Sequence, residues 1–116
     1  MKHLKRGRVF GRKKNQRAAL IRDLVRSLVK YEKITTTEAK AKSIKPIVEK
    51  IVTQGKNKNL ATTRRLGVLL DKELAKKISE ILSPRYQTRP GGYTKITKIP
   101  PRKSDGSPMA IIEFIK

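Results

Sequence analysis

Apolar residues recur at helical spacing near the start of the chain. Between residues 21 and 29 they occupy positions i, i+3, i+4, i+7 and i+8, and the residues between them are mostly charged or polar. The apolar positions are Ile21, Leu24, Val25, Leu28 and Val29. This spacing lines one face of an α-helix. The pattern predicts an amphipathic helix of about 15 residues that begins near Arg17.

A short β-branched segment and a helix start signal come next. Residues 33–36 are too few for a helix and rich in β-branched side chains, so they predict a brief strand. Thr35 precedes Glu38 by three positions, which is the spacing of a capping box, although Thr36 or Thr37 is an alternative cap. A second helix should therefore start in this run of threonines.

The second helix contains a proline. Its apolar stripe consists of Ile44, Ile47, Val48, Ile51 and Val52. The stripe runs up to Gly55, a residue typical of the position after a helix. Pro46 removes a hydrogen bond and costs about 3 kcal/mol inside a regular helix. Because the stripe keeps one phase on both sides of Pro46, we expect one bent helix with a buried face that includes Ile47.

The second half of the chain indicates two more helices and a hairpin. A short helix is expected from about Ala61, and Asp71 can cap another whose apolar face includes Ile81 and which ends at Ser83-Pro84. The runs 93–99 and 109–115 are β-branched or apolar, and the loop between them holds three prolines, so they indicate a β-hairpin. The last run is apolar on both faces, so it should form the central strand and be buried on much of both faces.

We expect an α+β fold, with about four helices packed on a small mixed three-stranded sheet and an extended basic N-terminal arm. We divide the chain into a basic arm at 1–15, which cannot bury a helical face, and a single domain at 16–116.

The net charge of the chain indicates the kind of partner that it binds. The chain has 30 Lys and Arg against nine Asp and Glu, a formal net charge of +21. Eight of the basic residues fall in the first seventeen positions, and the first carboxylate is Asp23. So large a charge favours a polyanionic partner, and nucleic acid is the leading candidate. RNA is favoured over DNA because no segment resembles a recognition helix with polar base readers.

Other interpretations of the basic start are less well supported. Transit peptides are amphipathic and rich in serine, whereas residues 1–17 contain no serine and include Gly7 and Gly11. An anionic-membrane segment or an inert charged surface are the remaining alternatives. No apolar run reaches the roughly 20 residues that span a bilayer, so we expect no membrane partner.

Catalytic chemistry has few candidates. His3 is the one histidine, cysteine is absent, and no carboxylates cluster at ligand spacing. We therefore expect no enzyme activity, no metal, no cofactor and no small-molecule substrate. Gly91 and Gly92 follow Pro90 and favour a tight turn, with phosphate binding as the alternative.

Three separated motifs resemble the bacterial large-subunit ribosomal protein L17 family. The segment 34–42 (Ile-Thr-Thr-Thr-Glu-Ala-Lys-Ala-Lys), with Glu49 to Thr53 six residues later, is similar to the family's signature region. Residues 1–5 with Gly7-Arg8, and residues 84–86 with 89–94, are similar to its basic start and its later motif. The motifs occur in order along essentially the whole chain. The middle of the arm, residues 9–15, departs from the family by being more basic and poorer in serine.

The resemblance implies an α/β domain with a small mixed sheet and an N-terminal arm that lies in ribosomal RNA. It implies a structural constituent of the large subunit, near the nascent-chain exit region, in the cytoplasm. The implied partners are large-subunit ribosomal RNA and neighbouring large-subunit proteins. A free nucleoid or RNA-chaperone protein that coats nucleic acid is the alternative function.

The resemblance also assigns site residues. Those expected to neutralise phosphates are Lys2, His3, Lys5, Arg6, Arg8, Arg12, Lys13, Lys14 and Arg17. Asn15 is expected to bond to a sugar or a base edge. An anion site at a helix N-terminus would use Thr35, Thr36, Lys40 and Lys42, with capping alone as the alternative for the threonines. A second RNA surface would consist of Arg85, Tyr86, Arg89, Gly91, Gly92 and Tyr93, and Tyr86 is equally compatible with the core.

Overall fold

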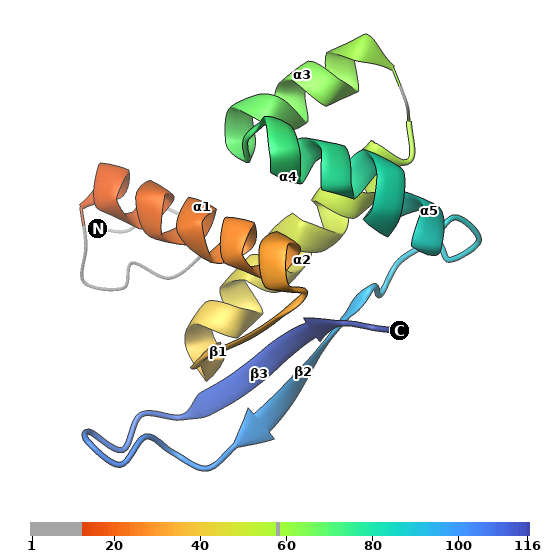
Figure 1. Ribbon diagram of the computed structural model, residues 1–116. Helices are drawn as coiled ribbons and strands as arrows, with labels where there is room; N and C mark the ends of the chain where they lie inside the picture. Colours follow the sequence, from red (N-terminus) through yellow and green to blue (C-terminus); the bar gives the residue numbers. More distant parts are fainter. Residues whose placement is uncertain (1–12, 58) are drawn as a thin grey trace, which may run out of the picture.

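The structure is a computed structural model that describes residues 13–57 and 59–116. The first half contains helix α1 (Lys14–Tyr31), strand β1 (Lys33–Thr37) and helix α2 (Glu38–Gly55). Helix α3 (Leu60–Leu69), helix α4 (Lys72–Lys77), a π-helical turn (Ile78–Leu82) and helix α5 (Ser83–Arg85) follow. Strands β2 (Thr94–Ile99) and β3 (Met109–Phe114) complete the described part (Figure 1). The α+β prediction is confirmed.

The three strands form an antiparallel sheet in the order β1-β3-β2. Strand β3 pairs with β1, from Lys33 opposite Glu113 to Thr37 opposite Met109, and with β2 on its other edge. The central position predicted for the last strand is confirmed. The expectation of a mixed sheet is wrong. Strands β1 and β2 run in the same direction, but β3 separates them, so no two parallel strands are neighbours.

Helix α2 lies across one face of this sheet and contacts all three strands. Alternate residues of β3 point into this contact, and Ala110, Ile112 and Phe114 are buried there. Helix α1 packs beside α2 and contributes Val25, Leu28 and Val29 to the same core. The opposite face of β3 is only partly buried, which differs from the burial on both faces that its sequence favoured. Its outward apolar side chains therefore do not belong to the main core.

Pro46 lies inside the single helix α2, so the prediction of one helix across the proline is confirmed. The stripe around it is buried at Ile44 and Val48, whereas Ile47 is only partly buried at the edge of the core. Thr37 is the cap, since its side chain accepts a hydrogen bond from the Lys40 N–H at 3.3 Å. Among the three threonines considered, the last one therefore starts the helix.

Gly55 has a different role from the one its type suggested. It is the last residue of α2, is buried, and does not adopt a left-handed conformation. A Cβ atom at this position would lie 2.4 Å from the Ser83 Oγ and 2.5 Å from the Ile78 Cγ2. The Ser83 hydroxyl donates to the Val52 carbonyl at 2.8 Å across the same contact. The glycine is required because two helical segments approach closely here.

The expected helix stop at Ser83-Pro84 is wrong, because helical backbone continues to Arg85. The Ser83 N–H donates to the Ile78 carbonyl, five residues earlier, as in a π turn. A proline ring clashes with the carbonyl four residues before it in a regular α-helix, and the wider turn before Pro84 relieves that clash. The turn also changes the phase of the apolar stripe. Ile81, predicted to be on the buried face, is 50% exposed.

Candidate RNA interface

Helix α1 carries the first group of candidate residues. Lys13 is the N-cap of α1, and Lys14 and Asn15 lie in its first turn, so the helix begins three residues before Arg17. The Lys13 N–H donates to the Gln16 Oε1 at 3.4 Å. Lys13, Lys14 and Asn15 are exposed, and Arg17 is partly buried. The predicted arm positions Lys2, His3, Lys5, Arg6, Arg8 and Arg12 lie outside the described residues.

A groove runs along the first turns of α1, toward α2 and α3. Its volume is about 440 Å³. Lys14, Arg17 and Arg22 line it together with apolar side chains that include Ile47 of α2 and Leu69 of α3. Arg22 was not among the residues predicted to contact RNA. The sequence spacing could have indicated it, because Lys14, Ala18 and Arg22 follow one another at i, i+4 and i+8 and so share one side of the helix.

A carboxylate of the chain itself lies at the start of α2, where the anion site was predicted. Thr35 and Thr36 lie in β1, where Thr35 is exposed on the outer face and Thr36 is buried against the helices. Glu38 occupies the first turn of α2, and its carboxylate lies 2.8 Å from the Lys42 Nζ and 3.5 Å from the Lys98 Nζ. The hydrogen bond from Lys42 lowers the pKa of Glu38.

A carboxylate therefore already satisfies the positive end of this helix. Lys42, one of the four residues predicted for the site, is engaged by that carboxylate. Lys40 is partly exposed, and its backbone N–H is bonded to the Thr37 cap.

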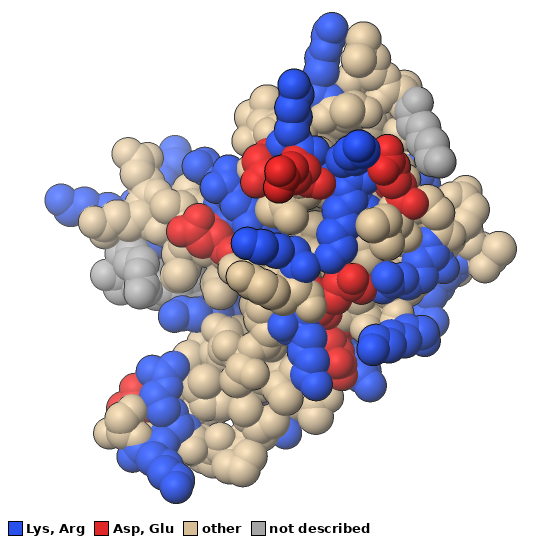
Figure 2. Space-filling view, in the orientation of Figure 1, with Lys and Arg blue, Asp and Glu red and all other residues tan. Residues whose placement is uncertain are grey.

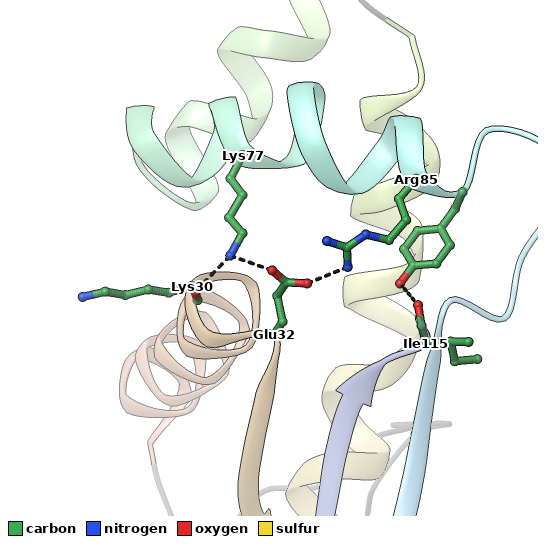
Figure 3. A network of polar contacts seen from close by, with 6 residues as sticks. Lys30, Glu32, Lys77, Arg85 and Ile115 are labelled. Atoms are coloured by element: carbon green, nitrogen blue, oxygen red, sulfur yellow. Dashed lines mark hydrogen bonds and ion pairs between the residues drawn. The ribbon is translucent and has the colours of Figure 1, made fainter.

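Arg85, predicted to contact RNA, forms an internal ion pair. Its Nη1 lies 2.5 Å from the Glu32 Oε1, while the Lys77 Nζ lies 3.3 Å from the Glu32 Oε2 and donates to the Lys30 carbonyl at 2.9 Å (Figure 3). The Arg85 hydrogen bond lowers the pKa of Glu32, and the same bond raises the pKa of Arg85. This polar network joins the end of α1 to α4 and α5.

The two tyrosines of the second predicted surface belong to the core. Tyr86 is 5% exposed and Tyr93 is fully buried. Their ring centroids are 5.1 Å apart, the Tyr86 hydroxyl donates to the Ile115 carbonyl, and the Tyr93 hydroxyl lies 3.0 Å from the Thr53 Oγ1. Rings held in this way have no free face for a base. The structure agrees with the interpretation of Tyr86 as a core residue. It does not agree with a stacking of Tyr93 on an RNA base, because the Tyr93 ring is buried.

One local and one long-range hydrogen bond hold the turn at 89–92. The Arg89 Nε donates to the Gly91 carbonyl at 3.0 Å, and the Lys56 Nζ donates to the Arg89 carbonyl at 2.5 Å. Gly92 has a φ of +66°, in the left-handed region, whereas Gly91 does not adopt a positive φ. Arg89 and Gly92 are exposed. Of Gly91 and Gly92, only Gly92 has a backbone conformation that favours glycine over other residues.

Lys and Arg side chains also lie on the outer face of the sheet and over other parts of the surface. Lys33 and Lys95 flank Glu113 on the three strands, with N–O distances of 4.0 and 3.4 Å. Figure 2 shows basic side chains over helices and hairpin alike, and acidic side chains in smaller groups, chiefly around α4. Within residues 13–57 and 59–116, no helix is long and apolar enough to cross a membrane. The same residues contain no cluster of three metal-ligating side chains.

The fold and this surface define a small α+β protein whose exposed charged side chains, within the described residues, are mainly cationic. Residues 20–115 match the model of the family described as ribosomal protein L17. This chain belongs to the ribosomal protein L17 family.

Curated relatives agree with this assignment. The large ribosomal subunit protein bL17 of Caldanaerobacter subterraneus subsp. tengcongensis is 46% identical, over 93% of this chain and 97% of the relative. The bL17 protein of Hydrogenobaculum sp. is 46% identical over the full length of both chains. That of Thermodesulfovibrio yellowstonii is 47% identical over 99% of this chain and 87% of its own length.

Proposed function

We propose that this chain is a structural constituent of the large ribosomal subunit that binds folded ribosomal RNA, neutralises its phosphates and carries out no catalysis. The observation that carries the proposal is the family match over residues 20–115, together with relatives whose names place them in the large subunit. The proposed partners are large-subunit ribosomal RNA and neighbouring ribosomal proteins.

The distribution of charge supports an RNA partner. Acidic side chains are mostly used within the fold, in ion pairs and helix caps. Those in ion pairs are Glu32, Glu38, Asp105 and Glu113, while Asp71 caps α4 through a 2.8 Å bond to the Leu74 N–H. With a net charge of +21, a large excess of surface cations is left for a polyanion. Phosphate contacts of this kind fix position and orientation on the RNA.

We assign the main contact to the arm and α1 together. Lys13, Lys14, Arg17 and Arg22 lie at the cap and on the first turns of α1, which takes in the end of the segment 1–15 predicted as the arm and directly follows residues 1–12. The arm itself contributes five Lys and Arg between residues 1 and 12 and no acid. A continuous stretch of cations would follow the RNA backbone from the arm onto the helix. Arg89, exposed in the turn before β2, is a separate candidate contact.

The salt dependence of binding tests the arm. Full-length protein and a variant that begins at Lys13, which keeps α1 and its cap, would be titrated with deproteinised large-subunit RNA. If the five arm cations meet phosphates, the slope of log K against log salt should be smaller by about 4 in the truncated variant. Equal slopes for the two proteins would contradict the assignment of the arm to RNA.

Sedimentation tests the subunit itself. A tagged copy should comigrate with large subunits in a sucrose gradient after a high-salt wash, because a fixed site combines many contacts. A protein that only coats nucleic acid would be released by the wash, since its binding is largely electrostatic. Release of the tagged copy would favour the nucleoid or RNA-chaperone alternative.

A further inference from the structure

The groove on α1 has an apolar floor and a cationic rim. Ile21 of α1, Ile47 of α2 and Leu69 of α3 line it, and each is only partly buried. Lys14 and Arg22 line it from the solvent side, and both are exposed. None of the described lining residues is acidic. Within the part of the chain that the structure describes, cations therefore border an apolar surface that remains accessible between three helices.

The small side chain of Ala18 keeps this groove open. Ala18 lies on α1 between Lys14 and Arg22, one helical turn from each, and is exposed. Lys14 and Arg22 are eight residues apart, or about 12 Å along the helix axis. The two cations can therefore hold groups on either side of a flat object seated over Ala18.

We propose that this groove receives an unstacked nucleobase of the ribosomal RNA, with the neighbouring phosphates held by Lys14 and Arg22. This inference rests on the RNA-binding function proposed above and adds a position for one base. A nucleotide combines a flat ring, which suits aliphatic side chains, with an anionic backbone, which suits the rim. Unpaired bases in loops and bulges are the usual targets of specific RNA recognition.

Charge complementarity favours RNA over a protein as the occupant. A protein segment that filled the same groove would have to bring carboxylates to the cations and an apolar side chain to the floor. The chain's own arm carries further cations, and these would meet Lys14 and Arg22 with like charge. A polyanion compensates the charges on the rim through its regular backbone, without such a specific arrangement of side chains.

Two neighbouring alanines provide a matched pair of variants. Ala18→Leu fills the groove, while Ala19→Leu adds the same side chain at an exposed position that does not line it. Leucine and alanine are both good helix formers, so α1 should be retained in each variant, as circular dichroism can verify. Neither variant changes the charge, which separates the groove from the electrostatic contacts.

Binding to deproteinised large-subunit RNA from the same organism is then measured against salt. Ala18→Leu should weaken binding about 10-fold with an unchanged salt slope, since a lost base contact is not a lost phosphate contact. Ala19→Leu should remain within about twofold of the unmodified protein. Equal binding by both variants would overturn the base site while leaving the RNA-binding function intact. Failure of the unmodified protein to bind RNA would instead overturn the function itself.

Cross-linking identifies the occupant directly. The chain contains no cysteine, so Ala18→Cys introduces a single thiol for a photoreactive label, and Ala19→Cys is the control. In assembled subunits, the label at position 18 should mark one or two unpaired bases, detected by primer extension, that the label at position 19 does not mark. Cross-links from position 18 to the arm or to a neighbouring protein would overturn the inference in favour of that occupant.

Discussion

Replacement of Glu32 by glutamine tests the polar network that joins α1 to the second half of the chain. Glu32 is the C-cap of α1, with a φ of 63°, and its carboxylate contacts Arg85 of α5 and Lys77 of α4. Its backbone also links elements, because its carbonyl accepts from the Phe114 N–H at 3.0 Å. Glu32→Gln removes the negative charge and leaves the backbone contacts in place. The substitution therefore isolates the ionic part of the junction.

The expected loss follows from how exposed the partners are. The side chains of Glu32 and Arg85 are both 32% exposed, and that of Lys77 is 21% exposed. Partly exposed pairs of this kind contribute up to about 1 kcal/mol each, and glutamine retains some of the hydrogen bonding. We expect Glu32→Gln to lower the free energy of unfolding by about 1 kcal/mol. In a domain of this size that corresponds to a fall in Tm of about 4 °C.

The effect should depend on pH with a defined sign. The hydrogen bond from Arg85, aided by Lys77, holds the pKa of Glu32 below its ordinary value of 4.5 in the folded protein. The charged carboxylate therefore stabilises the fold fully above the unfolded value, and this contribution is lost as the pH falls through the lower, folded value. The difference between the unmodified protein and Glu32→Gln should be constant above about pH 5.5 and should shrink below pH 4.5.

Thermal denaturation followed by circular dichroism measures these differences. Glu80→Gln is the matched control, because Glu80 is an exposed glutamate in the π-helical turn beside the network. A double-mutant cycle with Arg85→Ala assigns the coupling to the pair. A coupling energy near zero, or a penalty that grows as the pH falls below 4.5, would refute the reasoning. The cycle also tests whether Arg85, predicted as an RNA contact, contributes to stability instead.

Four further substitutions test packing and backbone geometry in urea denaturation. Gly55→Ala should destabilise the protein by about 1–3 kcal/mol, because its Cβ would lie 2.4 Å from the Ser83 Oγ; no loss would mean that the helices separate easily. Gly92→Ala should lower the free energy of unfolding by about 1 kcal/mol, because Gly92 has a positive φ. Gly91→Ala is the control and should be neutral, because no atom lies within 4 Å of an added Cβ. Equal effects of the two substitutions would contradict this reasoning. Ile44→Ala should cost about 2–5 kcal/mol, and a loss below about 1 kcal/mol would place it outside the core.

The second predicted RNA surface shows what residue types alone leave open. Arginine and tyrosine near a Pro-Gly-Gly turn are compatible with both RNA contact and internal packing, and the residue types alone do not distinguish them. Only the fold brings Glu32 to Arg85, across 53 positions of sequence. The same fold closes the core over Tyr86 and Tyr93. Whether a polar or aromatic side chain is available to a partner depends on such distant neighbours.

Local patterns were enough to predict most of the elements. Helical periodicity predicted α1 and α2, Asp71 was recognised as a cap, and the β-branched runs predicted a hairpin with β3 at the centre of the sheet. Each of these signals depends on neighbours within a few residues, so it is present before the chain folds. Net charge is similarly a property of composition, and it pointed to a polyanionic partner at once.

Tertiary structure decided the features that depend on contacts between distant segments. The sheet is wholly antiparallel because β3 lies between β1 and β2. The helical backbone continues past Pro84 because a π turn precedes the proline. Ser83 packs closely against α2 because residue 55 is a glycine. The groove on α1 also needs three helices to form. The sequence alone determined the periodic elements and the basic character of this chain, since both come from local composition. Which cations remain available to the proposed RNA partner was decided by folding, which pairs some of them with carboxylates far away in the sequence.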